Sequence, residues 1–199
     1  MSASRTATLR RSTAETDISL TLTFDGQGHA AVQTGIPFFD HMLTAFAKHS
    51  RIDLEVKVKG DLEVDFHHTV EDTGIVLGQA IDRALGEKRG LCRYGWALLP
   101  MDETLARVAI DFGGRPFLAY EAPAQAGPIG SSFPFTLVEE FLRAFAVNAR
   151  ANLHVALLSG RDAPHMAEAV FKGLAKAVDQ AATLDPRIAG DIPSTKESL

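Results

Sequence analysis

The sequence predicts an α+β fold made of two similar halves, each with a sheet whose strands face helices on one side. Strand-like alternation and helix-like spacing of apolar residues occur twice, in the same order, along the 199 residues. Blocks of sequence from the first half also recur in the second half. With 46% hydrophobic and 23% charged residues, the chain can build a sizeable core.

Three blocks of the first half recur in the second half without a change of order. They are residues 40–56 with 139–155, residues 67–81 with 164–178, and the Glu-Thr pairs that begin at Glu15 and Glu103. In the second block His68 aligns with His165 and Glu71 with Glu168. Chance similarity between apolar patterns could explain one shared block. Three shared blocks in the same order favour an internal duplication of the chain.

This duplication sets the expected domain organisation. We expect a single domain over residues 1–199, made of two repeats at about 8–93 and 94–185. Residues 186–199, which contain Pro and Gly, are expected to form a C-terminal tail.

In the first half, the apolar spacing predicts two strands and two helices. Apolar and polar residues alternate over residues 18–24 and again over 52–58, as in half-buried strands. Apolar residues recur at helical spacing over 39–46, just after Pro37, and over 70–84.

The second half gives the same kinds of element. The expected strands are 105–112 and 153–158, the expected helices are 137–147 and 164–182, and a loop is expected over 121–132. Asp162 is a candidate N-cap for the last helix, with Pro164 in its first turn, where a missing N–H is harmless. The Gly-Gly-Arg-Pro turn at 113–116 could be a simple hairpin.

Composition excludes several classes of protein. A formal net charge of −5 and a pI of about 5.8 argue against a nucleic-acid-binding protein. No apolar run approaches the roughly 18 residues of a membrane span. Residues 1–15 lack the apolar segment of a secretory signal, so we expect a cytoplasmic protein. The single Cys92 excludes an intramolecular disulfide and a zinc site built on several thiolates.

The histidines carry the candidate chemistry. His67 and Glu71 are four residues apart, so on a helix they share a face, with Cβ atoms about 5–6 Å apart. His68 is the next residue along the helix, so its side chain points in a different direction from that of His67. The His-His-x-x-Glu run can therefore offer ligands to two metal ions. In the expected strand over 153–158, His154 points to the face opposite that of its apolar neighbours. Imidazole and carboxylate without thiolate suit manganese, iron or zinc. The alternative is two amphipathic helices with polar N-termini.

The chain resembles the imidazoleglycerol-phosphate dehydratase family of histidine biosynthesis. The matching stretches are GIPFFDHML (35–43), DFHHTVEDTGIVLGQA (65–80), PMDETLARVAIDFGGRPF (100–117), EEFLRAFAVNARANLH (139–154), HMAEAVFK (165–172) and IPSTK (192–196). The resemblance implies a fold like domain 2 of ribosomal protein S5. It also implies a lyase that dehydrates imidazole glycerol phosphate to imidazole acetol phosphate. Two Mn²⁺ ions per subunit at subunit contacts, and a cytoplasmic homo-oligomer of 24 subunits, follow from the same resemblance.

The resemblance also implies residue roles. The implied metal ligands are His41, His67, His68, Glu71, His154, His165 and Glu168. The implied substrate-binding residues are Glu15, His41, His49, Arg93, Arg115, Lys172, Ser194 and Lys196, with the basic ones mostly near the phosphate. The implied catalytic residues are Glu15, Glu71 and Glu168.

These residue types suit the implied chemistry. A metal ion can act as a Lewis acid toward the imidazole ring, and a carboxylate such as Glu15 can move protons. Arg and Lys suit a phosphate group whose binding positions the reacting carbons.

Two positions depart from the family pattern. Pro164 stands where the family has the first His of a second His-His pair, four residues before Glu168, so one metal site loses a ligand. Phe66 stands where an Asp commonly precedes the first pair. We therefore keep a second hypothesis: an inactive or altered paralogue that acts as an assembly or small-molecule-binding protein. A His/Glu hydrolase is weaker, because the chain has no His-Glu-x-x-His, serine elbow or cysteine nucleophile.

Overall fold

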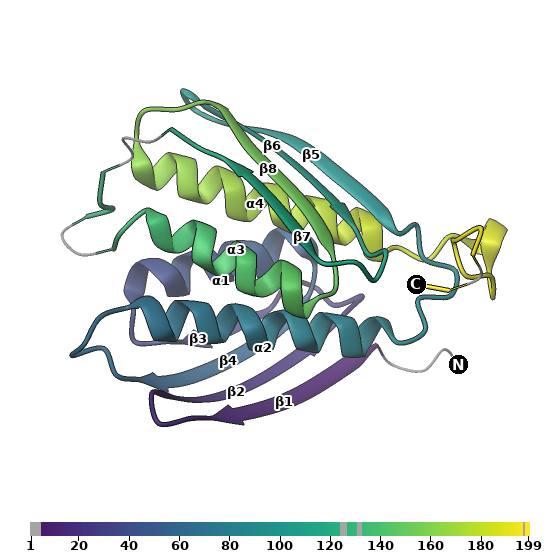
Figure 1. Ribbon diagram of the computed structural model, residues 1–199, viewed down its shortest axis with the longest axis horizontal. Coiled ribbons are helices and arrows are strands. Elements are labelled where there is room, and N and C mark those ends of the chain that lie inside the picture. The colour runs from purple at the N-terminus through teal and green to yellow at the C-terminus, as the bar shows by residue number, and fades with distance from the viewer. Residues whose placement is uncertain (1–4, 124–126, 131–132, 197) are drawn as a thin grey trace.

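Two four-stranded sheets enclose a double layer of helices between them (Figure 1). The computed structural model describes residues 5–123, 127–130, 133–196 and 198–199. The sheets have the strand orders β1-β2-β4-β3 and β5-β6-β8-β7, so the two halves share one topology. The predicted α+β class with two similar halves, each with helices on one side of its sheet, is confirmed.

The first half runs from β1 to α2. Its elements are β1 (Thr6–Ser12), β2 (Thr16–Thr23), β3 (Ala30–Gln33), α1 (Pro37–Ser50), β4 (Asp53–Gly60) and α2 (His67–Leu85). β2 pairs antiparallel with β1 and β4, whereas β3 pairs parallel with β4. Ile18, Leu20 and Leu22 are buried against the helices, as their alternation predicts.

The second half repeats this plan. Its elements are β5 (Tyr94–Met101), β6 (Thr104–Asp111), β7 (Phe117–Glu121), α3 (Thr136–Asn148), β8 (Asn152–Ser159) and α4 (Ala163–Ala182). A short 3₁₀ helix (Pro186–Ile188) follows in the tail. β6 pairs antiparallel with β5 and β8, and β7 pairs parallel with β8.

The alternation of apolar residues identified β2, β4, β6 and β8, but it missed the strands at both edges of each sheet. β5 (Tyr94–Met101) is apolar on both faces, because Trp96 and Leu98 point outward and are exposed. β3 (Ala30–Gln33) has only four residues, too few for a clear pattern.

The helices α2 and α3 pack closely because α2 carries glycine where the two backbones meet. A Cβ on Gly78 would lie 2.6 Å from the carbonyl oxygen of Phe145. A Cβ on Gly74, one turn earlier, would lie 2.8 Å from the carbonyl oxygen of Phe141. The glycines therefore allow an approach between the two halves that any larger residue would prevent.

Two local expectations need correction, and one lies partly outside the described residues. Asp162 occupies the N-cap position of α4, but its side chain makes no capping hydrogen bond. Residues 113–116 do not close a hairpin, because β7 pairs with β8 rather than with β6. Of the expected loop over 121–132, residues 124–126 and 131–132 are outside the described part of the chain.

None of the helices in the described residues is long and apolar enough to span a membrane.

Gly78→Ala should destabilise the fold, although alanine favours helix by about 1 kcal/mol over glycine. The new methyl group would meet backbone atoms of α3 that cannot move independently. We expect a net loss of about 1–3 kcal/mol in the free energy of unfolding, measured by denaturant titration. Gly127→Ala is the control, because a Cβ there meets no atom of the described residues within 4 Å. Equal stability of the two variants would contradict this packing.

Candidate active site

The first turn of α2 (His67–Leu85) brings two histidines against carboxylates. His67 Nε2 lies 3.7 Å from Glu71 Oε2, across one helical turn as the spacing predicts. His68 Nδ1 hydrogen bonds to Asp61 Oδ2 at 2.9 Å, and its Nε2 lies 3.7 Å from Glu15 Oε1. The hydrogen bond that Asp61 accepts is the largest of the effects that raise the pKa of His68.

A buried aspartate fixes this turn to the sheet. Asp72 follows Glu71 in α2 and accepts hydrogen bonds from Arg11 of β1 and Thr16 of β2. Thr16 in turn follows Glu15 directly, so one cluster sets the positions of both neighbouring carboxylates. In the second repeat Ala169 aligns with Asp72, so this clamp belongs to the first half alone.

The start of α4 (Ala163–Ala182) carries the equivalent histidine. His165 Nδ1 lies 2.9 Å from Glu103 Oε2, in hydrogen-bond contact. The Glu103 carboxylate also accepts the backbone N–H groups of Arg161 and Asp162. The hydrogen bond with His165, followed by those two N–H groups, holds the pKa of Glu103 far below its usual range. The same bond raises the pKa of His165.

A third group lies where α1 crosses α4. His41 Nε2 is 3.6 Å from Glu168 Oε2, and Lys172 Nζ is 2.6 Å from Glu168 Oε1. Burial works to raise the pKa of Glu168, but Lys172 and His41 outweigh it, and the net shift is downward. Burial, followed by Lys172 and Lys176, lowers the pKa of His49.

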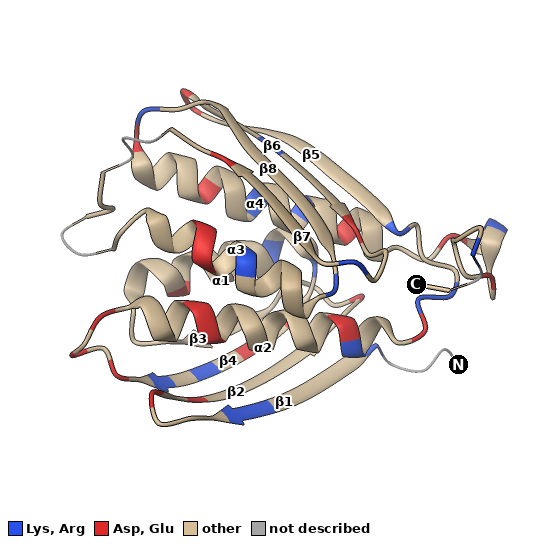
Figure 2. Ribbon diagram, viewed as in Figure 1, with Lys and Arg blue, Asp and Glu red and all other residues tan. Residues whose placement is uncertain are grey.

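His154 lies apart from these groups, on the outer face of the second sheet. It faces away from the helices, as its position in the alternation predicts, and its ring centroid lies 6.0 Å from that of Phe117. The same face exposes Tyr94, Trp96 and Leu98 of β5, and Figure 2 shows few charged residues along β5 and β8. His154 also lines a small hollow with Arg107 and Glu121, so this face combines exposed apolar residues of β5 with charged residues nearer the histidine.

The donor atoms of one chain form pairs rather than a complete set. Among the described residues, no three His, Cys, Asp or Glu side chains lie close enough together to hold a metal ion. The pairs nevertheless fit a cation of the manganese type. Each combines imidazole nitrogen with carboxylate oxygen, and two of the histidines use Nδ1 for a carboxylate and leave Nε2 free as a ligand.

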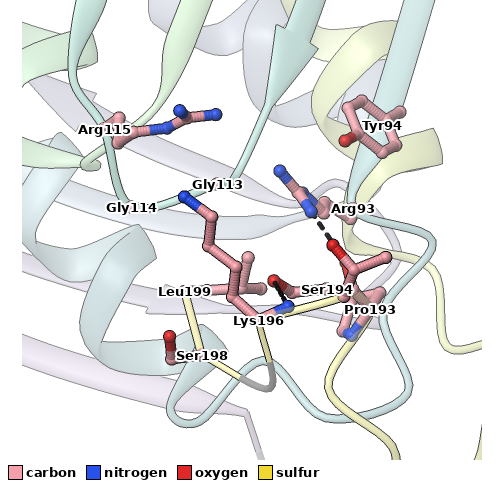
Figure 3. A pocket seen from close by; sticks show the side chains of 11 residues that line it. Arg93, Tyr94, Gly113, Gly114, Arg115, Pro193, Ser194, Lys196, Ser198 and Leu199 are labelled. Atoms are coloured by element: carbon pink, nitrogen blue, oxygen red, sulfur yellow. Dashed lines mark hydrogen bonds between the residues drawn. The ribbon is translucent and has the colours of Figure 1, made fainter.

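A cationic cavity of about 740 Å³ opens at the other end of the second sheet (Figure 3). Four of the predicted substrate-binding residues line it, namely Arg93, Arg115, Ser194 and Lys196. Gly113 and Gly114 form part of its wall. The side chains of Arg115 and Lys196 are exposed, and no described acidic side chain forms an ion pair with either. Their charges are therefore available to an anion.

Arg93 has a different place in this cavity. Its guanidinium binds both carboxylate oxygens of Asp111 and donates to the carbonyl oxygen of Pro193 at 2.7 Å. Arg93 thus holds the tail segment against the sheet in addition to lining the cavity. Lys172, also predicted near the phosphate, does not line this cavity and binds Glu168 instead.

The start of α4, which carries His165, and the C-terminal tail, whose residues line the cationic cavity, lie at opposite ends of the second sheet (Figure 1). β6 begins at Thr104, next to Glu103, and ends at Asp111, which binds Arg93. Eight residues of extended strand span roughly 25 Å. A small molecule cannot contact both ends within one chain.

Sequence reasoning missed the two carboxylates, Asp61 and Glu103, that hydrogen bond to Nδ1 of His68 and His165. Glu103 was detectable, since it is the repeat partner of Glu15. Asp61 carried no signal, because it lies in a loop segment outside the recurring blocks.

Lys196→Ala should weaken binding of phosphate to the cavity by about 10-fold to 100-fold, because a charge-assisted hydrogen bond is lost. Calorimetric titration with inorganic phosphate measures this affinity. The unfolding midpoint should stay unchanged, because Lys196 is exposed. Lys59→Ala, which removes an exposed lysine from β4, is the control. Equal phosphate affinity in all three proteins would rule out this assignment.

The chain is similar in sequence to proteins of one known family. The sequence model of the imidazoleglycerol-phosphate dehydratase family matches residues 34–178. The imidazoleglycerol-phosphate dehydratase of Akkermansia muciniphila is 57% identical over 195 residues, which is 98% of this chain and 100% of that protein. That of Rhodopseudomonas palustris strain TIE-1 is 56% identical, with 98% of each chain covered.

Solved structures with a similar fold come from the same family. The dehydratase of Staphylococcus aureus superposes with a TM-score of 0.81 at 37% identity, covering 90% of this chain and 99% of that one. The Pyrococcus furiosus enzyme, solved in complex with (S)-C348, gives 0.82 at 34% identity, covering 96% and 100%. The chain therefore belongs to the imidazoleglycerol-phosphate dehydratase family, a family of hydro-lyases.

Proposed function

We propose that the protein is an active, manganese-dependent imidazoleglycerol-phosphate dehydratase of histidine biosynthesis. It would convert imidazole glycerol phosphate to imidazole acetol phosphate with loss of one water. The observation that carries the proposal is the combination of imidazole–carboxylate pairs at one end of the sheet with a cationic cavity at the other. These two kinds of site match an imidazole ring and a phosphate group.

Metal ligands would come from the pairs described above, together with His154 on the outer face of the second sheet. The proposed ligands are His41, His67, His68, Glu71, His154, His165 and Glu168. Bound Mn²⁺ would act as a Lewis acid and stabilise negative charge that develops on the substrate ring. No thiolate competes for this role, since Cys92 is the only cysteine of the chain.

Glu15 is the proposed proton carrier. Dehydration removes a proton from carbon and releases hydroxide, which leaves as water once it is protonated. Glu15 suits this task because its side chain is 52% exposed and approaches only one imidazole nitrogen, at 3.7 Å. A carboxylate held so loosely can accept a proton and deliver it again.

Arg115, Ser194 and Lys196 would hold the phosphate, with Arg93 keeping the tail in place. Because phosphate takes no part in the chemistry, its binding serves to orient the reacting carbons. Lys172 could contribute to phosphate binding only in another site, since it lies at the Glu168 end of its own chain.

We propose that each active site forms between subunits of a cytoplasmic homo-oligomer of 24 chains. The roughly 25 Å between the ends of the sheet supports this, because a small substrate needs both kinds of residue at once. The apolar residues exposed on β5 also support it, because burial against another chain would remove Trp96 and Leu98 from water.

The altered-paralogue hypothesis rests on Pro164. It lies in the first turn of α4, where it is well tolerated. It leaves Glu168 without an imidazole one turn earlier on its own helix, such as His67 gives to Glu71; its imidazole neighbour is His41 of α1, at 3.6 Å. One of the two metal ions would then bind more weakly, or only when the substrate supplies a nitrogen.

Metal removal and the variant Pro164→His together test these alternatives. Chelation should abolish dehydration, and Mn²⁺ should restore it better than Mg²⁺, because imidazole ligands favour manganese. Pro164→His should raise the Mn²⁺ bound per chain toward two and raise activity at limiting Mn²⁺. Calorimetry gives the binding, and an assay of imidazole acetol phosphate gives the rate.

Each outcome separates the hypotheses. Full activity of metal-free protein would contradict metal dependence. Recovered metal binding in Pro164→His without any dehydration would favour the paralogue. If wild type already binds two equivalents equally tightly, and the variant changes nothing, another ligand fills the place of Pro164.

A further inference from the structure

Glu15 and Glu103 occupy the same place in the two repeats but have different surroundings. Each precedes the second strand of its sheet, and each lies near the equivalent histidine of a following helix. The Glu15 carboxylate is 52% exposed and accepts no hydrogen bond from any described residue. The Glu103 side chain is 25% exposed and has several donors. The duplicated position therefore has two different environments.

The two oxygens of Glu103 have separate partners. Oε1 accepts the backbone N–H groups of Arg161 at 3.1 Å and Asp162 at 2.9 Å. It also accepts the Thr104 hydroxyl at 3.1 Å. Oε2 contacts His165 Nδ1 at 2.9 Å. The Glu103 carboxylate thus connects the turn between β5 and β6 with the loop before α4 and with the imidazole of His165.

These contacts determine which ring nitrogen of His165 carries the proton. An ionised carboxylate can only accept, so Nδ1 must be the N–H group in the neutral ring. Nε2 then keeps its lone pair. Asp102 and Asp162 lie 3.8 and 3.7 Å from Nε2, beyond hydrogen-bond distance.

We infer that Glu103 is a positioning residue that holds His165 as the Nδ1–H tautomer, with Nε2 presented for metal binding. The inference rests on the proposed function, in which His165 is a ligand. Asp61 does the same for His68 in the first half, with Nδ1 at 2.9 Å. Because Asp61 accepts the hydrogen bond from His68 Nδ1, Glu15 does not have to make that contact and remains available for proton transfer.

Glu103→Gln tests this role. The glutamine oxygen should keep the N–H groups of Arg161 and Asp162, since the amide NH₂ would oppose them. The NH₂ then faces Nδ1, which must accept, so the proton moves to Nε2. We expect ¹⁵N-histidine solid-state NMR of metal-free protein at alkaline pH to show this change. We expect Mn²⁺ affinity to fall about 10-fold to 100-fold.

Asp102→Asn is the matched control. It removes a carboxylate near the same ring, but one that makes no hydrogen bond to Nδ1. Its Mn²⁺ affinity should stay within about 2-fold of wild type, which separates the hydrogen bond from a general loss of negative charge. In a His165→Gln background, Glu103→Gln should have no further effect on Mn²⁺ affinity, because its action passes through His165.

The outcomes are distinct. If wild type binds Mn²⁺ and Glu103→Gln binds it equally well, the positioning role is wrong and the proposed function stands. If wild type binds no Mn²⁺, the proposed function fails first. The tautomer of His165 in wild type needs no variant to fold, and a proton on Nε2 there would overturn the inference directly.

Discussion

The contact between α2 and α3 is the constraint on which the arrangement depends. Each sheet has one apolar face that must be covered, and the helices of both halves share the space between the two sheets (Figure 1). Gly74 and Gly78 let α2 and α3 meet at backbone distance. The two halves therefore form one continuous core, and the starts of α2 and α4 are fixed in relation to the sheets.

The chemistry follows from this frame. Histidines in the first turns of α2 and α4 meet carboxylates from the neighbouring strand connections, in both repeats. The tail folds back at the opposite end of the second sheet and completes the cationic cavity, held there by Arg93. Duplication explains why the two histidine sites are alike. Later change explains why they differ at Pro164, Asp72 and the pair of Glu15 and Glu103.

The sequence predicted the parts of the fold that have one apolar and one polar face. The central strands and all four helices met that condition, and the edge strand β5 did not. β5 failed because Trp96 and Leu98 are apolar on the outer face, where a lone chain would need polar residues. Within the site, the proximity of His67 and Glu71 followed from helical spacing. The contact of His165 with Glu103, 62 residues earlier, depends on tertiary structure that no local pattern contains.

In the proposed enzyme, an active site takes its histidines and its phosphate-binding cavity from different chains. Co-expression of two inactive forms tests it most directly, one with His165→Ala and the other with Arg115→Ala and Lys196→Ala together. Random co-assembly should leave up to about a quarter of the sites intact, and dehydration should return in that proportion. Mixed assemblies that remain as inactive as either parent would contradict the claim and assign the whole site to one chain.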